Sequence, residues 1–344
     1  MANKYTFIIV VVFLFTHGVV KAQDPVFSQF YAAPLYLNPA LSGAETSILL
    51  NVSYRRQWQS LDLPYDIGQF TFNYPLITNT RIRKHIGGIG LSVFRESSGV
   101  NRSLLTMGAL ASGAFNWSFD RTGINKISIG LQAGFIQKSI NFNNFEWSSQ
   151  YDPFLGFQAS VAPSIINELE GSRAYPTFNA GVLWSHNPDK IVSPFSAFVG
   201  VAASNLNKPN ESLVQDKSYN LPMLFKFQGG LDFHLTSVLI LSPNVLILRQ
   251  NETNQFNVGT YLGYNFIEKR DAINVIQIGV WHRVNDSFIF SGGFTNNKVF
   301  VGISFDFTSS TLRYDTRRQR AYEISISYKI PQIKGLRRCS IPLL

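Results

Sequence analysis

The sequence is short of cysteine, methionine and charged residues. Its 344 residues include one Cys and three Met, and Asp, Glu, Lys and Arg together make up 15% of the chain. The single cysteine, Cys339, excludes a disulfide framework within one chain. Soluble proteins carry about 25% charged residues. The low charge therefore indicates that part of the surface faces something other than water.

Long hydrophobic runs are also missing beyond the N-terminus. No later stretch reaches the ~18 uninterrupted apolar residues that a membrane-spanning helix needs. If the chain crosses a membrane, strands must cross it. Aromatic residues are plentiful, with 29 Phe and 14 Tyr, and such a composition excludes a disordered chain. The length allows two ordinary soluble domains or one large barrel.

Residues 1–22 predict a secretory signal peptide. Lys4 supplies the positive start, Tyr5–Phe15 the apolar centre, and a small-residue cleavage site ends at Ala22. A retained membrane anchor is the alternative, but an apolar run of roughly eleven residues is too short to span. A lipoprotein would need a cysteine just after this run. We therefore expect an exported protein whose mature chain begins at Gln23.

The formal net charge of the chain is +9. The basic residues are scattered singly among aromatics, and they cluster only at Arg313–Arg320 and Lys334–Arg338. Nucleic-acid binding calls for a continuous basic patch. The scatter favours outer-membrane lipid or a protein partner over nucleic acid.

From about Ile48 to Ile330 the chain repeats one kind of unit. An alternating apolar and small-or-polar stretch of near ten residues is followed by a turn rich in Asn, Asp, Gly or Ser. For example, Ile127 and Ile129 alternate with Ser128, which predicts a strand with one apolar face. No window has sustained helical spacing, and no linker or change of composition marks a second domain.

The alternation fits a soluble β-sandwich or solenoid as well as a membrane barrel. Three features favour the barrel: the strands are long, aromatics such as Trp58 and Trp117 gather at strand ends, and the polar face is mostly uncharged. Outer-membrane barrels need strands of about 9–11 residues with aromatic girdles. We therefore expect an all-β, transmembrane outer-membrane β-barrel. Its expected lipid face includes Ile127, Ile129, Leu131, Val301, Ile303 and Phe305.

The strand count follows from parity. Fifteen stretches qualify, but single-chain bacterial barrels have even counts. The weakest candidate is Phe157–Ile166, which Pro163 interrupts. Without it, about 14 antiparallel strands remain. The predicted organisation is a signal peptide (1–22), an ordered N-terminal segment (23–47), a barrel (48–330) and a basic periplasmic tail (331–344), with exterior excursions at Ile140–Ala174, Asn205–Leu221 and Thr308–Arg320.

The sequence offers little evidence for catalysis or metal binding. The four histidines of the expected mature chain have no HxxxH or HExxH spacing, and no GxSxG motif occurs. His282, Asp286 and Ser287 form an imaginable catalytic set, but one sequence offers many such triples by chance. The glycines of Gly87–Gly90 lie in a strand without a following helix, so they do not indicate a phosphate site. We expect no catalytic residue, cofactor or metal.

The segment Gln23–Ala44 carries a resemblance. It contains two motifs, Phe27-Ser28-Gln29-Phe30 and Asn38-Pro39-Ala40-Leu41-Ser42-Gly43. A third motif, Tyr54-Arg55-Arg56-Gln57-Trp58, follows them. This order resembles the opening of the PorP/SprF family of Bacteroidetes outer-membrane proteins, which is associated with the type IX secretion system and gliding motility. The resemblance continues through Gly130–Phe135, Gly279–Arg283 and Tyr322–Tyr328, although Leu41-Ser42 and Arg283 depart from the family pattern.

The resemblance implies a non-enzymatic barrel that serves protein export. It would be a core component of the machinery or an accessory for a large secreted adhesin; a passive or ligand-selective channel and a barrel enzyme are the alternatives. The aromatic content of Gln23–Ala44 predicts an ordered segment that binds a partner or fills the lumen. The candidate partner-binding residues are Phe27, Gln29, Tyr31, Asn38, Pro39, Gly43, Tyr54, Arg55, Gln57, Trp58, Arg313, Arg317, Arg318 and Arg320.

Overall fold

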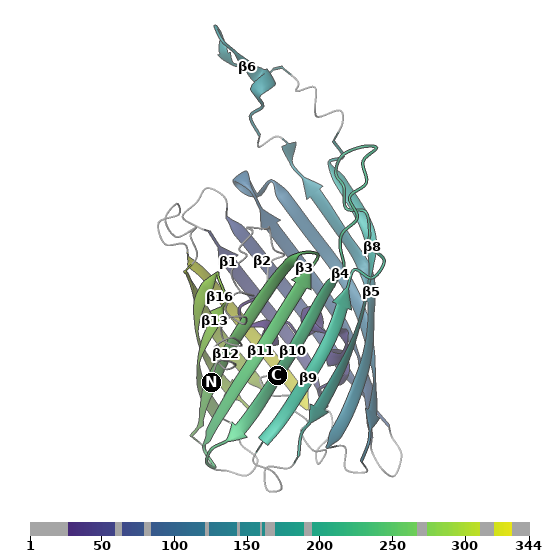
Figure 1. The fold of residues 1–344 in the computed structure, drawn as a ribbon, viewed down its shortest axis with the longest axis vertical. Coiled ribbons are helices and arrows are strands. Elements are labelled where there is room, and N and C mark those ends of the chain that lie inside the picture. Colours follow the sequence, from purple (N-terminus) through teal and green to yellow (C-terminus); the bar gives the residue numbers. More distant parts are fainter. Residues whose placement is uncertain are drawn as a thin grey trace, which may run out of the picture.

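The computed structural model is a closed antiparallel barrel with a segment of its own chain inside it (Figure 1). It describes residues 27–58, 64–78, 84–120, 124–142, 145–158, 160–161, 169–188, 195–266, 274–309 and 320–331. The expected signal peptide and almost all of the expected basic tail lie outside the described residues.

Fourteen strands form the wall, as the sequence predicts. They are β1 (Ser47–Gln57), β2 (Tyr65–Ile77), β3 (His85–Ser98), β4 (Leu104–Ser118), β5 (Asn125–Ile140), β8 (Ser172–His186), β9 (Phe195–Ser204), β10 (Leu224–His234), β11 (Leu239–Gln250), β12 (Thr253–Asn265), β13 (Asn274–Arg283), β14 (Ser287–Asn296), β15 (Val299–Thr308) and β16 (Arg320–Pro331).

Each strand pairs with its sequence neighbours, and β1 closes the barrel against β16 with Ser47 opposite Pro331. Both ends of the wall therefore lie at one rim, which we call the terminal end. The opposite rim, the loop end, carries the long connections 141–171 and 205–223. The described residues of the rejected candidate Phe157–Ile166 contribute no wall strand. Instead, β6 (Tyr151–Asp152) and β7 (Gly156–Phe157) form a separate hairpin, which projects beyond the loop end in Figure 1.

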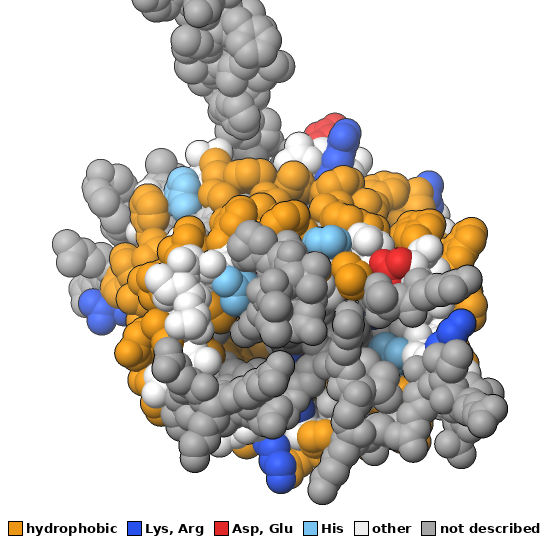
Figure 2. Space-filling model, turned by 90° about the horizontal axis from the view of Figure 1, so that it is seen from below, with side chains coloured by type: hydrophobic (Ala, Val, Ile, Leu, Met, Phe, Trp, Pro, Cys, Tyr) orange, Lys and Arg blue, Asp and Glu red, His pale blue; other side chains and the backbone are white. Residues whose placement is uncertain are grey.

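The two faces of the wall differ as the alternation predicts. On β5, Ile129 is 50% exposed and Leu131 is 66% exposed. Ser128, which precedes Ile129 and points to the opposite face, is 0% exposed. The same pattern recurs on β15, where Ile303 points outward and Ser304 inward. Seen from the terminal end, hydrophobic side chains line much of the visible edge of the molecule (Figure 2).

Short helices occupy the interior: η1 (Phe30–Ala32), α2 (Pro34–Leu37) and η2 (Pro39–Gly43). Proline stands at the first position of α2 and of η2, where its missing N–H costs no helical hydrogen bond. Asn38 caps η2, because its side chain accepts a hydrogen bond from the backbone N–H of Ala40 at 2.9 Å. Two further 3-10 turns, η3 (Val100–Arg102) and η5 (Ser148–Gln150), lie in loop-end connections.

None of the helices among the described residues is long and apolar enough to cross a membrane.

The hydrophobic core lies inside the barrel. Residues 27–46, the lumenal segment, pack against apolar side chains of the inner wall. The ring of Phe30 meets that of Trp281 edge to face at 5.1 Å, and Tyr31 meets Tyr261 at 5.5 Å. Each such aromatic pair stabilises a protein by about 0.5–1.5 kcal/mol more than the burial of its surface area alone. The interior is thus a packed core that the chain supplies for itself.

Candidate functional site: the lumenal segment and its wall

The lumenal segment runs from the loop end of the barrel to the terminal end. Its first residues contact Asp306, two residues before the end of β15, and Glu323, three residues after the start of β16. At its other end, Glu45 pairs with Lys329 close to the terminal rim. The segment therefore crosses most of the barrel before β1 turns back along the wall.

A buried ionic cluster holds the start of the segment. Ser28 donates its backbone N–H to Glu323 at 2.7 Å and its hydroxyl to Asp306 at 2.8 Å. Arg55 pairs with Asp306 at 2.8 Å and with Glu323 at 3.6 Å, and it also donates to the Ser28 hydroxyl. Arg283 lies 3.5 Å from Asp306. Two carboxylates and two guanidiniums thus surround one serine, and removing one partner would leave an uncompensated buried charge.

Gln29 extends this network across the interior. Its backbone N–H donates to Glu323 at 3.0 Å, and its Oε1 accepts from Ser325 at 2.7 Å. The Tyr31 hydroxyl donates to the same Oε1 at 3.2 Å and accepts from the Tyr261 hydroxyl at 2.8 Å. These bonds join the segment to β12 and β16 through Gln29 and Tyr31.

The middle of the segment lies directly on the wall. The amide of Asn38 donates to the carbonyl of Val182 at 3.1 Å and to that of Val201 at 3.4 Å. This approach requires glycine at Gly181, where an added Cβ would lie 2.0 Å from Asn38 Oδ1. At Gly88 a Cβ would lie 1.9 Å from the carbonyl oxygen of Ser42. The missing side chain of Gly88 on β3 thus leaves space for η2.

Polar side chains of the wall also satisfy the last carbonyls of the segment. Asn116 donates to the carbonyl of Gly43 at 2.7 Å, and Lys126 donates to that of Ala44 at 3.2 Å. Farther along the segment towards the loop end, Lys226 donates to the carbonyl of Tyr36 and lies 4.0 Å from the centre of its ring. Contacts from wall strands on several sides therefore position the segment along its length.

The structure brings together most of the residues that the sequence singles out. Seven candidates lie in the interior as parts of the segment or of its wall: Phe27, Gln29, Tyr31, Asn38, Pro39, Gly43 and Arg55. Gln57 accepts a hydrogen bond from Arg55, and Trp58 packs on the cluster around Phe27. Of the two roles left open for the segment, filling the lumen is the one seen here.

The remaining candidates lie elsewhere. Tyr54 points to the outer wall and donates to Asp66 at 2.8 Å. Arg320 is exposed at the start of β16, with its guanidinium 5.9 Å from the ring centre of Phe307. Arg313, Arg317 and Arg318 lie outside the described residues, so their part in partner binding stays a prediction.

Sequence reasoning missed the partners on the wall. Asp306 and Glu323 are the only carboxylates of their strands, and Lys126 and Lys226 each have uncharged residues on both sides in the sequence. A lone charge on a lumen-facing position is the available signal, since it must find a partner once the interior is filled. Its partner is not readable from spacing, because Ser28 and Glu323 are 295 residues apart.

His282 does not join the other two members of the imagined catalytic set. Ser287 donates to Asp286 at 3.2 Å, and Asp286 pairs with Arg283 at 2.9 Å, whereas His282 stacks on Phe288 with ring centres 4.5 Å apart. Within the described ranges, His, Cys, Asp and Glu side chains form no group of three that would hold a metal ion.

A closed barrel with an apolar outer wall and a filled interior that buries polar as well as apolar side chains defines the class of this protein: it is an outer-membrane β-barrel protein. Residues 19–328 match the model of the family described as type IX secretion system membrane protein PorP/SprF. The chain belongs to this family, which confirms the resemblance seen in its motifs. No curated protein matches the chain.

Solved structures are similar to the chain. The toluene transporter TbuX of Ralstonia pickettii is similar with a TM-score of 0.50 and 10% identity, over 90% of this chain and 96% of that one. The toluene transporter TodX of Pseudomonas putida is similar with a TM-score of 0.46 and 11% identity, over 87% of this chain and 93% of that one. At such low identity the likeness concerns the barrel fold alone.

Proposed function

We propose that the protein is a non-enzymatic component or accessory of the type IX secretion system. In this role it supports export or surface attachment of large proteins, such as gliding adhesins, by docking them and the secretion machinery. Membership of the PorP/SprF family supports a role in the type IX secretion system. The filled interior supports docking over conduction, because docking needs no passage through the barrel.

The observation that carries this proposal is the fixed lumenal segment. Its two ends and its middle are each bonded to the wall: Ser28 to Asp306 and Glu323, Asn38 to Val182, and Glu45 to Lys329. A passive or ligand-selective channel would have to break these contacts. We orient the loop end towards the cell exterior, because outer-membrane barrels place their long loops there and their short turns in the periplasm.

The β6–β7 hairpin is the exterior surface that we assign to an exported partner. Asp152 Oδ1 accepts hydrogen bonds from the backbone N–H groups of Phe154 at 2.7 Å and Leu155 at 2.9 Å, and Gly156 adopts a φ of +75°. This turn holds Phe154 and Leu155 at 96% and 75% exposure. Exposed apolar groups on an ordered tip beyond the membrane are typical of a protein contact.

A disulfide that fixes the lumenal segment to the wall distinguishes the docking function from the channel function. An added Cβ at Gly43 would lie 3.1 Å from Cβ of Ala114, slightly closer than the spacing of about 3.5–4.5 Å in a disulfide, and 2.8 Å from Oδ1 of Asn116, which must move aside. Gly43→Cys with Ala114→Cys, in a chain with Cys339→Ser, would fix the segment to β4. We expect normal export of surface proteins by oxidised cells, because docking leaves the segment in place. Loss of export that a reductant restores would show that the segment must move, and would favour the channel.

The hairpin has its own test. Phe154→Ser with Leu155→Ser should leave folded barrel in the outer membrane but reduce the amount of adhesin displayed on the cell surface, measured by antibody labelling. Leu206→Ser, on the other long connection and 42% exposed, is the matched control. Unchanged display with the double variant would contradict the assignment of the hairpin.

A further inference from the structure

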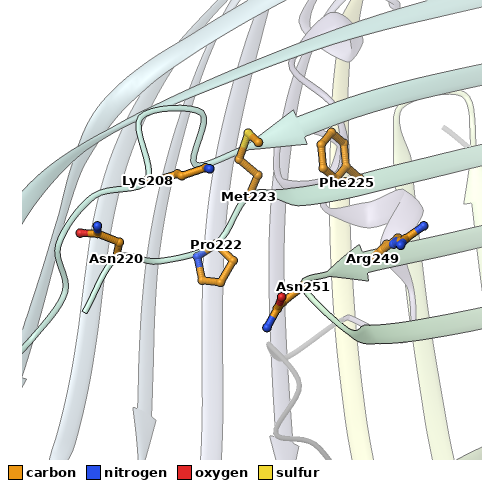
Figure 3. A pocket seen from close by; sticks show the side chains of 7 residues that line it. All are labelled: Lys208, Asn220, Pro222, Met223, Phe225, Arg249 and Asn251. Carbon is orange, nitrogen blue, oxygen red and sulfur yellow. The ribbon is translucent and has the colours of Figure 1, made fainter. Parts of the chain in front are cut away.

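A pocket lies on the outer wall of the barrel at the loop end. It encloses about 580 Å³ and is lined by two cations, two amides and three apolar side chains: Lys208, Asn220, Pro222, Met223, Phe225, Arg249 and Asn251. Figure 3 shows these side chains on three neighbouring stretches of chain, namely the 205–223 connection with the start of β10, the end of β11, and the turn after it.

The pocket opens on the lipid-facing side of the wall. Phe225 and Arg249 are cross-strand partners on β10 and β11, and both are exposed. Their neighbours Leu224 and Leu248 point inward and belong to the buried core. Because side chains alternate along a strand, Phe225 and Arg249 must point outward. Arg249 is the second-last residue of β11, so the pocket lies at the rim where hydrocarbon gives way to headgroups.

An ordered loop completes the pocket. Asn210 and Asn220 form an antiparallel bridge within the 205–223 connection, and the backbone N–H of Leu221 donates to the carbonyl of Pro209 at 2.9 Å. The N–H of Lys208 donates to the carbonyl of Asn205 at 2.9 Å in a tight turn. These bonds hold Lys208 beside Pro222 and Met223, so the cation is part of a defined surface.

The two cations of the pocket lack acidic partners. In the part of the chain that the structure describes, neither Lys208 nor Arg249 is in a salt bridge, and no carboxylate lines the pocket. Some other loop-end cations are paired, such as Arg102 with Asp66 at 2.9 Å and Lys138 with Glu211 at 3.1 Å. The pocket therefore combines unbalanced positive charge with an apolar side.

We propose that this pocket binds a phosphorylated lipid of the outer leaflet. Lys208 and Arg249 would hold the phosphate, since ammonium and guanidinium groups both bind phosphate oxygens. Pro222, Met223 and Phe225 would contact the start of an acyl chain. Cations at a membrane rim gain from anionic lipid in this way. The assignment of the leaflet rests on the orientation proposed above, whereas the site itself is independent of any role in export.

Lipid binding to the purified, folded, full-length protein tests the proposal. Native mass spectrometry in detergent would count bound dioleoyl phosphatidic acid, with dioleoylglycerol and inorganic phosphate as probes that each lack one half of the ligand. We expect the wild type to retain phosphatidic acid, and Lys208→Gln with Arg249→Gln to weaken it at least about tenfold, because two charged hydrogen-bonding groups are lost.

A charge-matched variant serves as the control. Lys217→Gln with Arg95→Gln also removes two exposed cations, one from the same connection and one from the outer wall of β3, and should bind like the wild type. Equal weakening in both double variants would show a general charge effect and overturn the proposal. Retention of dioleoylglycerol equal to that of phosphatidic acid would show an apolar groove, and tight binding of phosphate alone a free-anion site; either result would also overturn it.

Heat-modifiable electrophoretic mobility checks that each variant is folded. Export by the Lys208 and Arg249 double variant is a separate readout. Normal export with lost lipid binding supports the pocket and leaves the secretion role untouched. Normal lipid binding by this double variant would overturn the pocket proposal, whatever its export.

Discussion

The two faces of the barrel wall are built for opposite surroundings. On the inner face, the side chains of Arg55 and Glu323 are 2% and 0% exposed, whereas on the outer face Leu131 is 66% exposed. A soluble protein shows the reverse, because charges need water and apolar groups avoid it. The difference shows that side chains left exposed on the outer wall are suited to contact lipid hydrocarbon. Side chains buried on the inner wall are suited to contact the lumenal segment of the same chain.

The largest effect should follow from breaking the inner ionic cluster. Arg55→Ala removes the cation between Asp306 and Glu323, so two buried carboxylates lose their main partner. We expect a loss of about 3–5 kcal/mol in the free energy of unfolding, measured by urea titration in detergent or lipid. Arg95→Ala, at an exposed outward position on β3, should change it by under about 0.5 kcal/mol. Similar losses in both variants would mean that inner and outer charges are equivalent.

Placing charge on the outer face should have the next largest effect. Leu131→Arg should cost about 2–4 kcal/mol in lipid bilayers, because a mid-strand charge must enter hydrocarbon. Leu206→Arg, on a loop-end connection, is the control and should cost little. Near-equal values would contradict the lipid-facing register.

Arginine should be poorly tolerated on the inner face as well as on the lipid face. A lumen-facing position is expected to tolerate arginine better than a lipid-facing one, and Ser128 and Ser304 are such positions. Both are 0% exposed, and Ser128 donates to Asn116 at 2.6 Å. Because the interior is filled, Ser128→Arg should greatly reduce the yield of heat-modifiable barrel. A normal yield would show open space beside Ser128.

A smaller effect is expected from the neutral contacts of the segment. Asn38→Ala removes the amide that bonds Val182 and Val201 and the cap that bonds Ala40. The expected loss is about 1–2 kcal/mol in the free energy of unfolding. Asn296→Ala, at an exposed turn of the terminal end, removes a similar cap from Lys298 and should cost only a few tenths. An Asn38 variant as stable as the Asn296 variant would mean that the lumenal segment adds little.

The smallest effect concerns apolar side chains that face water. Phe154→Ser with Leu155→Ser should change the free energy of unfolding by under about 0.5 kcal/mol, because neither side chain is buried. A loss above about 2 kcal/mol in urea titration would show that the hairpin packs on the barrel.

The wall was largely predictable because its signals are local. The alternation of Ile127, Ser128 and Ile129 fixes which side chains face outward, and the aromatics at strand ends mark the membrane. Parity then removed the weak stretch Phe157–Ile166 and left fourteen strands. Each of these inferences needs only neighbouring residues and a rule about closed barrels.

The interior was predictable only in part. The aromatic content of the segment indicated order, but its partners come from strands up to 296 residues away, such as Ser325 for Gln29. No spacing in the sequence relates such positions, so Asp306 and Glu323 looked like ordinary members of a polar face. The pocket at Lys208 and Arg249 is equally hidden, because it depends on how one connection folds against two strands.

The central claim is that the N-terminal segment closes the barrel and that the protein acts by docking. Conductance in planar bilayers tests it most directly, with full-length protein compared with a chain that lacks Gln23–Ala44 and keeps its signal. We expect no steady conductance from the full-length protein, steady open channels from the deleted and heat-modifiable barrel, and failed export in cells carrying the deletion. Stable channels formed by the full-length, folded protein would contradict the claim.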